Sequence, residues 1–213
     1  NEQFREEATG YVCQFTGLSE DWFNDKKIID VGCGNGAFLQ YLRRKDQTLQ
    51  LSGIDLSPNT AEGITFIQGD FRNAQLKEKY DAIYSFMAIE HAKDIQFFIE
   101  RINMISHKNT VLCINTINNN SLVYRIARIL SKIRFNAPSN RLYSKHHLNH
   151  FTNTSLQRLL KENDWVILEH WNHNYPMAAV DVPKSNKAIE LFFKAMVAGM
   201  FFFSSIIGHI NKH

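Results

Sequence analysis

The chain alternates short apolar runs with segments whose apolar residues recur at helical spacing. Runs rich in β-branched and aromatic residues predict strands at residues 28–31, 49–54, 64–68, 81–85, 110–115 and 165–169. The segments between them predict helices at residues 37–42, 95–106, 122–132 and 154–163, the last capped by Thr152 or Thr154. Strands that alternate with helices indicate an α/β fold, with a mostly parallel, doubly wound sheet covered by helices on both faces.

The length of the chain favours a single domain. Its 213 residues, 44% of them hydrophobic, are enough for one normal core. We expect an N-terminal helical flap at 1–26, a ligand-binding core at 27–170 with a cap insertion at about 118–150, and an apolar extension at 171–213. Only residues 56–63 join the second and third strands, whereas a parallel crossover normally needs about a dozen residues.

Charge and cysteine content exclude some classes of protein. A net charge of +3 and a pI of 8.7 are too low to indicate a nucleic-acid-binding protein on their own. Three cysteines without a CxxC pair indicate neither a disulfide framework nor a zinc site. No basic-then-apolar secretory leader opens the sequence, which starts at Asn1, so we expect a cytoplasmic protein.

The most specific motif is DVGCGNG at residues 30–36, which joins the first strand to a helix. Its GxGxG spacing differs from the GxGxxG loop that places a pyrophosphate on a helix N-terminus. Asp30 stands at the entrance of the loop, where a carboxylate repels a phosphate but attracts an ammonium group. Asp55 ends the second strand about 20 residues later, where an acid accepts hydrogen bonds from ribose hydroxyls. The pattern predicts a phosphate-free nucleoside cofactor, S-adenosylmethionine.

Two further segments follow predicted strands at the same edge of the sheet. After the third strand, Asp70 is placed to accept the adenine amino group, with Phe71 on one face of the ring and Leu56 on the other. After the fourth strand come Glu90 and His91, at the carboxyl edge where open α/β sheets bind ligands. We expect Glu90 and His91 near the transferable methyl group.

Together these segments resemble the class I S-adenosylmethionine-dependent methyltransferases, especially the small-molecule branch with the ubiquinone-biosynthesis O-methyltransferases. The resemblance covers about residues 27–168. It implies a Rossmann-like fold with a helical cap, an antiparallel last strand and a C-terminal apolar helix. It also implies that the cofactor is bound by Asp30, Gly32, Cys33, Gly34, Gly36, Asp55, Leu56, Asp70, Phe71, Phe86 and Met87.

The candidate catalytic groups lie in two stretches of the chain. His91, with Glu90 beside it, is the first candidate for a base that deprotonates the acceptor, because histidine titrates near neutral pH. The alternative is that His91 only caps or packs a helix. Tyr143, His146, His147 and His150 crowd the stretch where this family folds over the acceptor, and they are predicted either to bind the acceptor or to be solvated.

Metal and nucleic acid are not expected at this site. A small-RNA methyltransferase branch holds a divalent metal with two glutamates and two histidines, but Met87 replaces the first of those acids. Arg125, Arg128, Lys132 and Arg134 form a basic stripe that is read as a solvated face. The segment after the fourth strand also lacks the Asn/Asp-Pro-Pro-aromatic motif of many base-amine methyltransferases, which argues against a flipped base.

The C-terminal stretch 188–210 is apolar almost all round, but Glu190 and Lys194 interrupt it. It is expected to pack over the acceptor pocket or in a homodimer, or to dock on a membrane surface near a lipid-like acceptor. The sequence predicts a methyltransferase acting on a small molecule, with oxygen as the acceptor atom. The alternatives are a catalytically inactive cofactor-binding partner protein and an RNA methyltransferase.

Overall fold

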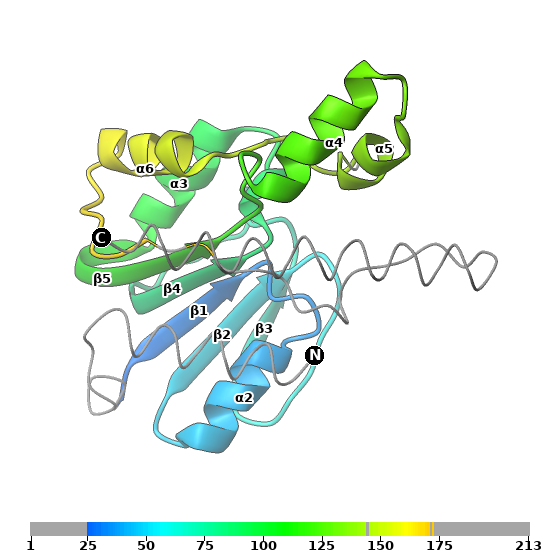
Figure 1. Cartoon of the computed structure of the whole chain (residues 1–213). Helices are drawn as coiled ribbons and strands as arrows, with labels where there is room; N and C mark the ends of the chain where they lie inside the picture. The colour runs from blue at the N-terminus through cyan, green and yellow to red at the C-terminus, as the bar shows by residue number, and fades with distance from the viewer. Residues whose placement is uncertain (1–24, 144, 171, 173–213) are drawn as a thin grey trace. The chain divides into compact units, whose positions relative to one another are not determined.

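The computed structural model of the protein describes residues 25–143, 145–170 and 172. Five strands form one parallel sheet in the order β3-β2-β1-β4-β5 (Figure 1). Their bounds are β1 Lys27–Val31, β2 Gln50–Asp55, β3 Ile64–Gln68, β4 Tyr80–Phe86 and β5 Ser106–Asn115. The five predicted strands from 28 to 115 are therefore confirmed. Because the chain order reverses beside β1, the carboxyl ends of β1, β2 and β4 form the edge at which such sheets bind ligands.

Helices cover both faces of this sheet, as predicted. Their bounds are α2 Ala37–Lys45, η2 Ile89–His91, α3 Ile95–Met104, α4 Leu122–Lys132, α5 Ala137–Leu142 and α6 Asn153–Glu162. Ile28 and Ile29 are both fully buried but join different core clusters, because successive strand residues point to opposite faces. The cluster around Ile28 contains residues of α2, and the cluster around Ile29 contains residues of α3 and α6 (Figure 1).

The short crossover between β2 and β3 contains no helix. Residues 56–63 instead form an extended connection and a turn, with an isolated bridge between Ala61 and Ile64. The guanidinium of Arg43, on α2, donates to the carbonyl oxygens of Leu49 at 2.6 Å and Gly63 at 2.5 Å. One side chain therefore fastens the chain segments that precede β2 and β3.

The predicted strand at 165–169 is not formed, so the described sheet has no antiparallel last strand. Trp165 packs against the core and its Nε1 donates to Asn103 Oδ1 at 2.8 Å, but Val166 is 80% exposed. A strand needs a neighbour for its backbone groups, and no described strand pairs with this segment.

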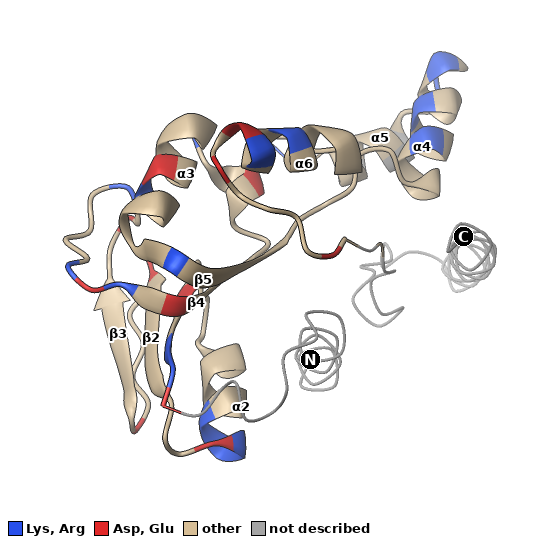
Figure 2. Ribbon diagram, turned by 90° about the vertical axis from the view of Figure 1, so that its left-hand side faces the viewer, with Lys and Arg blue, Asp and Glu red and all other residues tan. Residues whose placement is uncertain are grey.

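The described residues belong to two compact units. One comprises residues 25–117 together with 145–169, and contains the sheet; the other comprises residues 118–143 together with 170 and 172. In the second unit α4 packs with α5, and Figure 2 shows Lys and Arg along α4. Within the described residues, no helix is both long and apolar enough to cross a membrane. The predicted N-terminal flap and most of the C-terminal extension lie outside the described residues.

Candidate functional site

The glycine loop that follows β1 has a backbone that only glycine adopts without strain. Gly32, Gly34 and Gly36 have φ values of 80°, 54° and 69°, all in the left-handed region. A Cβ added at Gly32 would lie 2.6 Å from the Cβ of Ala88, and one at Gly36 would lie 2.5 Å from the ring of Phe66. A Cβ at Gly34 would meet no atom of the described residues within 4 Å, so among them the backbone there faces open space. The loop is thus a tight turn with one open stretch of backbone.

Asp55, at the end of β2, holds this loop in place. Its Oδ2 accepts a hydrogen bond from Gly34 N at 2.9 Å, and its Oδ1 accepts one from Ser57 N at 2.9 Å. The carbonyl oxygen of Ile54 accepts from Gly32 N at 2.9 Å. Each carboxylate oxygen has a second lone pair, so Asp55 retains acceptor capacity for a diol.

The two other loop residues predicted at the cofactor are largely buried. Asp30 is 3% exposed at the end of the central strand, where it pairs with Gly53 on one side and Tyr84 on the other. Cys33 is 8% exposed and packs with α2; burial, reinforced by Asp30 and Asp55, raises the pKa of its thiol to about 12. Cys33 is therefore a neutral core thiol, and only its backbone lies in the loop.

On the predicted adenine side, the structure assigns different roles to adjacent residues. Asp70 forms an ion pair with Arg72, which lowers the pKa of the Asp70 carboxyl. Phe71 is 8% exposed and its ring centroid lies 5.3 Å from that of Phe98 in the core. Phe71 is thus a core residue rather than a cover for a ligand ring, since its side chain turns inward. Leu56 is 72% exposed and remains available to contact a ligand.

The segment after β4 turns sharply toward the glycine loop. Met87 adopts a φ of 55°, and its N–H donates to the carbonyl oxygen of Asn115 at 2.9 Å. Phe86 packs its ring edge-on against Phe38, with centroids 5.0 Å apart. This turn positions the short helix η2, which carries Glu90 and His91.

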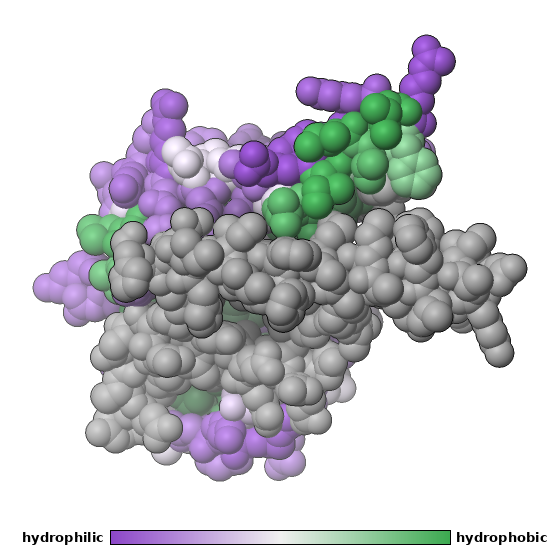
Figure 3. Space-filling model, viewed as in Figure 1, coloured by the Kyte–Doolittle hydropathy of each residue, from purple (hydrophilic) through white to green (hydrophobic). Residues whose placement is uncertain are grey.

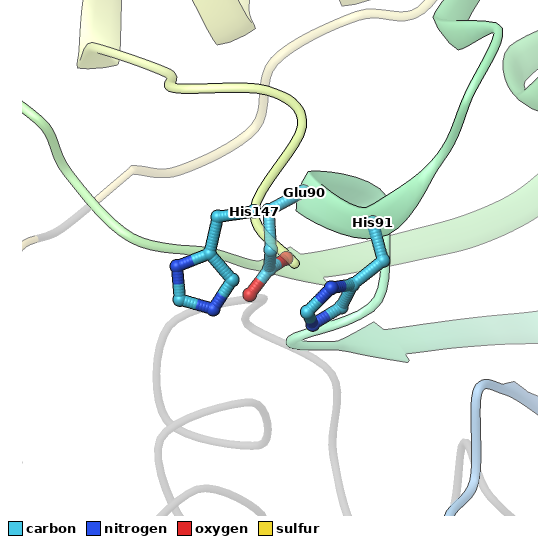
Figure 4. Close-up of side chains that lie close together, drawn as sticks. All are labelled: Glu90, His91 and His147. Atoms are coloured by element: carbon cyan, nitrogen blue, oxygen red, sulfur yellow. The ribbon is translucent and has the colours of Figure 1, made fainter. Parts of the chain in front are cut away.

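Glu90, His91 and His147 come together at η2, with the Glu90 carboxylate between the two imidazoles (Figure 4). Glu90 is only 1% exposed; its Oε2 accepts from Thr116 Oγ1 at 2.9 Å, while its Oε1 has no partner among the described residues. The rings of His91 and His147 have centroids 5.1 Å apart. A buried carboxylate oxygen without a hydrogen bond is costly, so it indicates a role toward a proton or a ligand.

The loop that carries His147 is bonded to η2 through the backbone of Glu90. The carbonyl oxygen of Glu90 accepts from Leu148 N at 2.9 Å and Asn149 N at 3.0 Å. Asn149 Nδ2 also donates to the carbonyl oxygen of Ala92 at 2.5 Å. These bonds bring two segments more than 50 residues apart to one place.

Electrostatics distinguish the histidines of this cluster. Burial, followed by the neighbouring His91, lowers the pKa of His147, although Glu90 opposes the shift; His146 and His150 lower it slightly further. His91 Nδ1 lies 2.8 Å from the carbonyl oxygen of His146. Because a carbonyl only accepts, Nδ1 carries the proton, so Nε2 is the basic nitrogen of the neutral His91 ring.

Donor atoms of Glu90, His91 and His147 all lie within 4.8 Å of one another. A carboxylate and two imidazoles are ligand types that hold divalent metals as well as protons. Met87 stands where the related metal site has its first acid, but His147, from a distant part of the chain, adds an imidazole beside Glu90 and His91. The cluster therefore offers three donors rather than two.

The structure selects among the predicted acceptor residues. It brings the side chain of His147 to Glu90, whereas His146 contributes its carbonyl oxygen. Tyr143 belongs to the second unit, where its hydroxyl donates to Asn119 Oδ1 at 2.8 Å. Sequence reasoning missed Thr116, because a threonine after a strand carries no signal of its partner.

The glycine loop also fits the predicted cofactor. The open backbone at Gly34 offers a cradle that a side chain would fill, and Asp55 lies beside it with acceptor capacity. Exposed Leu56 adjoins Asp55, where an apolar surface suits an adenine ring. These features suit an amino acid joined to a ribose and a base, which is the chemistry of S-adenosylmethionine.

Comparison with known proteins shows a family match over most of the chain. The model of a family described as "Methyltransferase domain" matches residues 4–170. The ubiquinone biosynthesis O-methyltransferase of Pelagibacter ubique is 30% identical over 103 residues, 43% of this chain and 42% of that protein. A malonyl-[acyl-carrier protein] O-methyltransferase of Calditerrivibrio nitroreducens is 27% identical over 114 residues, 51% of this chain and 46% of that protein. The chain thus spans less than half the length of these two relatives.

Solved structures agree with this fold. The plantazolicin methyltransferase BpumL, solved with a triazolic desmethylPZN analog and SAH, superposes with a TM-score of 0.58 at 20% identity, covering 74% of this chain and 62% of that one. At this identity the likeness concerns the fold alone.

Proposed function

Because the chain belongs to this methyltransferase domain family, of the class I S-adenosylmethionine-dependent type, we propose that it transfers the cofactor's methyl group to an oxygen of a small-molecule acceptor. The observation that carries the proposal is the glycine loop of residues 32–36 fastened to Asp55. Oxygen is favoured because the two relatives described above are named O-methyltransferases.

Different residues of the chain bind different portions of the cofactor. The backbone of Gly32, Gly34 and Gly36 takes the methionine portion, the Asp55 carboxylate takes the ribose hydroxyls, and Leu56 contacts the base. When bound, the cofactor supplies a methyl group already activated by a sulfonium. The protein therefore contributes mainly by holding donor and acceptor about 3 to 3.5 Å apart and in line.

The acceptor side uses the cluster at η2. His91 Nε2 is the nitrogen that takes the proton of an acceptor hydroxyl, because Nδ1 is committed to the His146 carbonyl. The buried Glu90 carboxylate lies close enough to stabilise the imidazolium that forms. His147, with its lowered pKa, is neutral at pH 7 and does not compete with His91 for a positive charge.

The cofactor part is tested by thermal unfolding with S-adenosylhomocysteine. We expect the melting temperature to rise on addition of this product. Asp55→Asn should weaken binding about 10-fold to 150-fold, because a hydrogen bond to a charged group contributes about 1.5 to 3 kcal/mol. The matched control is Asp46→Asn, which removes an exposed carboxylate that accepts locally from Thr48. No shift in the wild type, or an unchanged shift in Asp55→Asn, would refute the assignment.

The acceptor part is tested by turnover on a panel of phenols, catechols, carboxylic acids and amines. We expect methylation of hydroxyl acceptors, with kcat lowered about 100-fold or more in His91→Gln while S-adenosylhomocysteine affinity stays unchanged. His107→Gln is the control, because His107 pairs with Asp81 near the start of the sheet strands. Turnover restricted to amines would contradict oxygen transfer, and cofactor binding without turnover on any acceptor would favour an inactive binding protein.

A further inference from the structure

Helix α4 exposes its apolar side, the reverse of an ordinary surface helix. Its buried residues are Tyr124 and Ala127, which lie one turn apart on one side. Ile129 and Ile133 lie one turn apart on a different side and are 61% and 71% exposed. Leu122 and Ile126 extend that stripe at helical spacing, and they are partly exposed. Surface helices usually bury such a stripe against a core.

Local packing fixes this orientation. The Tyr124 hydroxyl donates to the carbonyl oxygen of Leu142 at 2.9 Å, and the Ser139 hydroxyl donates to the carbonyl oxygen of Ala127 at 2.9 Å. The rings of Tyr124 and Tyr143 meet edge to face, with centroids 5.2 Å apart. The polar and small side of α4 is thus bonded to α5 and the residue after it, which leaves Ile129 and Ile133 exposed. Figure 3 shows apolar surface in this part of the molecule.

A band of positive charge runs beside this stripe. Residues 118–144 contain five Lys and Arg residues and no Asp or Glu. Arg125, Arg128 and Lys132 recur three and four residues apart, and with Ile129 they line a shallow groove of about 240 Å³. Figure 2 shows Lys and Arg along α4, and no Asp or Glu on this helix.

We infer that α4 is a docking helix for the surface of an anionic phospholipid membrane. The apolar stripe, which we define as Leu122, Ile126, Ile129 and Ile133, enters the boundary between headgroups and acyl chains, while the adjoining cations meet lipid phosphates. Charge alone would also suit RNA, but an RNA backbone leaves four aliphatic side chains in water. None of the residues of this surface is assigned to methyl transfer above, so the inference does not depend on the proposed function.

Sedimentation with vesicles tests the inference on the full chain. We expect binding to vesicles of 70% phosphatidylcholine and 30% phosphatidylglycerol, which weakens as salt is raised, and little binding to pure phosphatidylcholine. Arg125→Gln with Lys132→Gln should lower partitioning about 25-fold, because each cation near an anionic surface contributes about five-fold. Ile129→Ser with Ile133→Ser should lower it as well. Arg44→Gln with Lys45→Gln, on α2, is the charge-matched control and should bind like the wild type.

Each outcome decides the question, because the substituted side chains are exposed and far-UV circular dichroism verifies that the variants fold. Equal binding to both vesicle types, or unchanged binding of either α4 variant, overturns the inference. An equal loss of vesicle binding in the α2 control variant would show that only the net charge of the protein matters, and this too would overturn the inference. The inference would also be overturned if the wild-type protein did not bind vesicles but used the same residues to bind a duplex RNA, or to self-associate as measured by light scattering.

Discussion

The packing of Gly32 against Ala88 gives the sharpest test of the site's architecture. In Gly32→Ala the new Cβ would lie 2.6 Å from the Cβ of Ala88, whereas apolar carbons rest at about 3.5 to 4.0 Å. Ala88 has no flexible end that can move away, so the backbone that leads to Glu90 and His91 must shift. Overpacking of this kind costs about 1 to 3 kcal/mol. The left-handed backbone, with φ of 80°, adds about 1 to 2 kcal/mol for alanine.

The expected loss of unfolding free energy is therefore about 2 to 5 kcal/mol, or about 4 to 20 °C in melting temperature for a domain of this size. Gly34→Ala isolates the backbone contribution, because its Cβ would meet nothing within 4 Å in the part of the chain that the structure describes. Ala88→Gly in the Gly32→Ala background removes the clash alone. The double-mutant cycle compares urea unfolding of the wild type, Gly32→Ala, Ala88→Gly and the variant with both changes. It should give a coupling energy between positions 32 and 88 of about 1 to 3 kcal/mol. A coupling energy near zero, or equal losses in Gly32→Ala and Gly34→Ala, would refute the reasoning.

Three further predictions concern the cluster at η2. Asn149→Ala removes the amide that donates to the carbonyl oxygen of Ala92, so it should lower the free energy of unfolding by about 1 to 3 kcal/mol. It should also lower kcat without changing S-adenosylhomocysteine affinity. An unchanged kcat would show that this hydrogen bond does not position the loop that carries His147. Thr116→Val leaves Glu90 Oε2 without its hydroxyl and should destabilise by about 1 to 3 kcal/mol in urea, whereas Thr116→Ser should not. The pKa of His147 is lowered in the folded state, so the unfolded chain binds its proton more readily; stability from this group is complete above a pH of about 6.5 and is lost as pH falls toward the folded pKa. His147→Gln should therefore flatten the dependence of the melting temperature on pH between pH 5 and 7.5. An identical dependence in the variant would exclude His147 as its source.

Much of the fold was predictable because it is encoded locally. The runs at 28–31 and 81–85 are apolar enough to be buried on both faces, which identifies them as inner strands of a parallel sheet. The glycine loop was predictable for the same reason, since three alternate glycines permit a backbone that few other sequences adopt. Pro138 and its polar neighbours favour a loop at 136–140, but that prediction is wrong: α5 spans Ala137–Leu142, because proline also suits the first turn of a helix.

The acceptor side of the site depended on contacts that no local pattern reports. Four candidates crowd residues 143–150, and sequence spacing does not distinguish them. The choice of His147 follows from the bonds of Leu148 and Asn149 to the carbonyl oxygen of Glu90, which set the direction in which each neighbouring histidine points. The position of Phe71 after Asp70 predicted a contact with the adenine ring, but the Phe71 side chain is buried in the core.

The sequence by itself determined the order of the strands along the chain, the glycine loop and the acid that fastens it, because these depend on residue type and spacing within one crossover. Only the tertiary structure decided which histidine meets Glu90 and which side of α4 remains exposed. The physical reason is that both depend on hydrogen bonds to backbone carbonyls, at Glu90 for the histidine loop and at Leu142 for the helix. Every residue presents such a carbonyl, so the sequence does not show which one will be used.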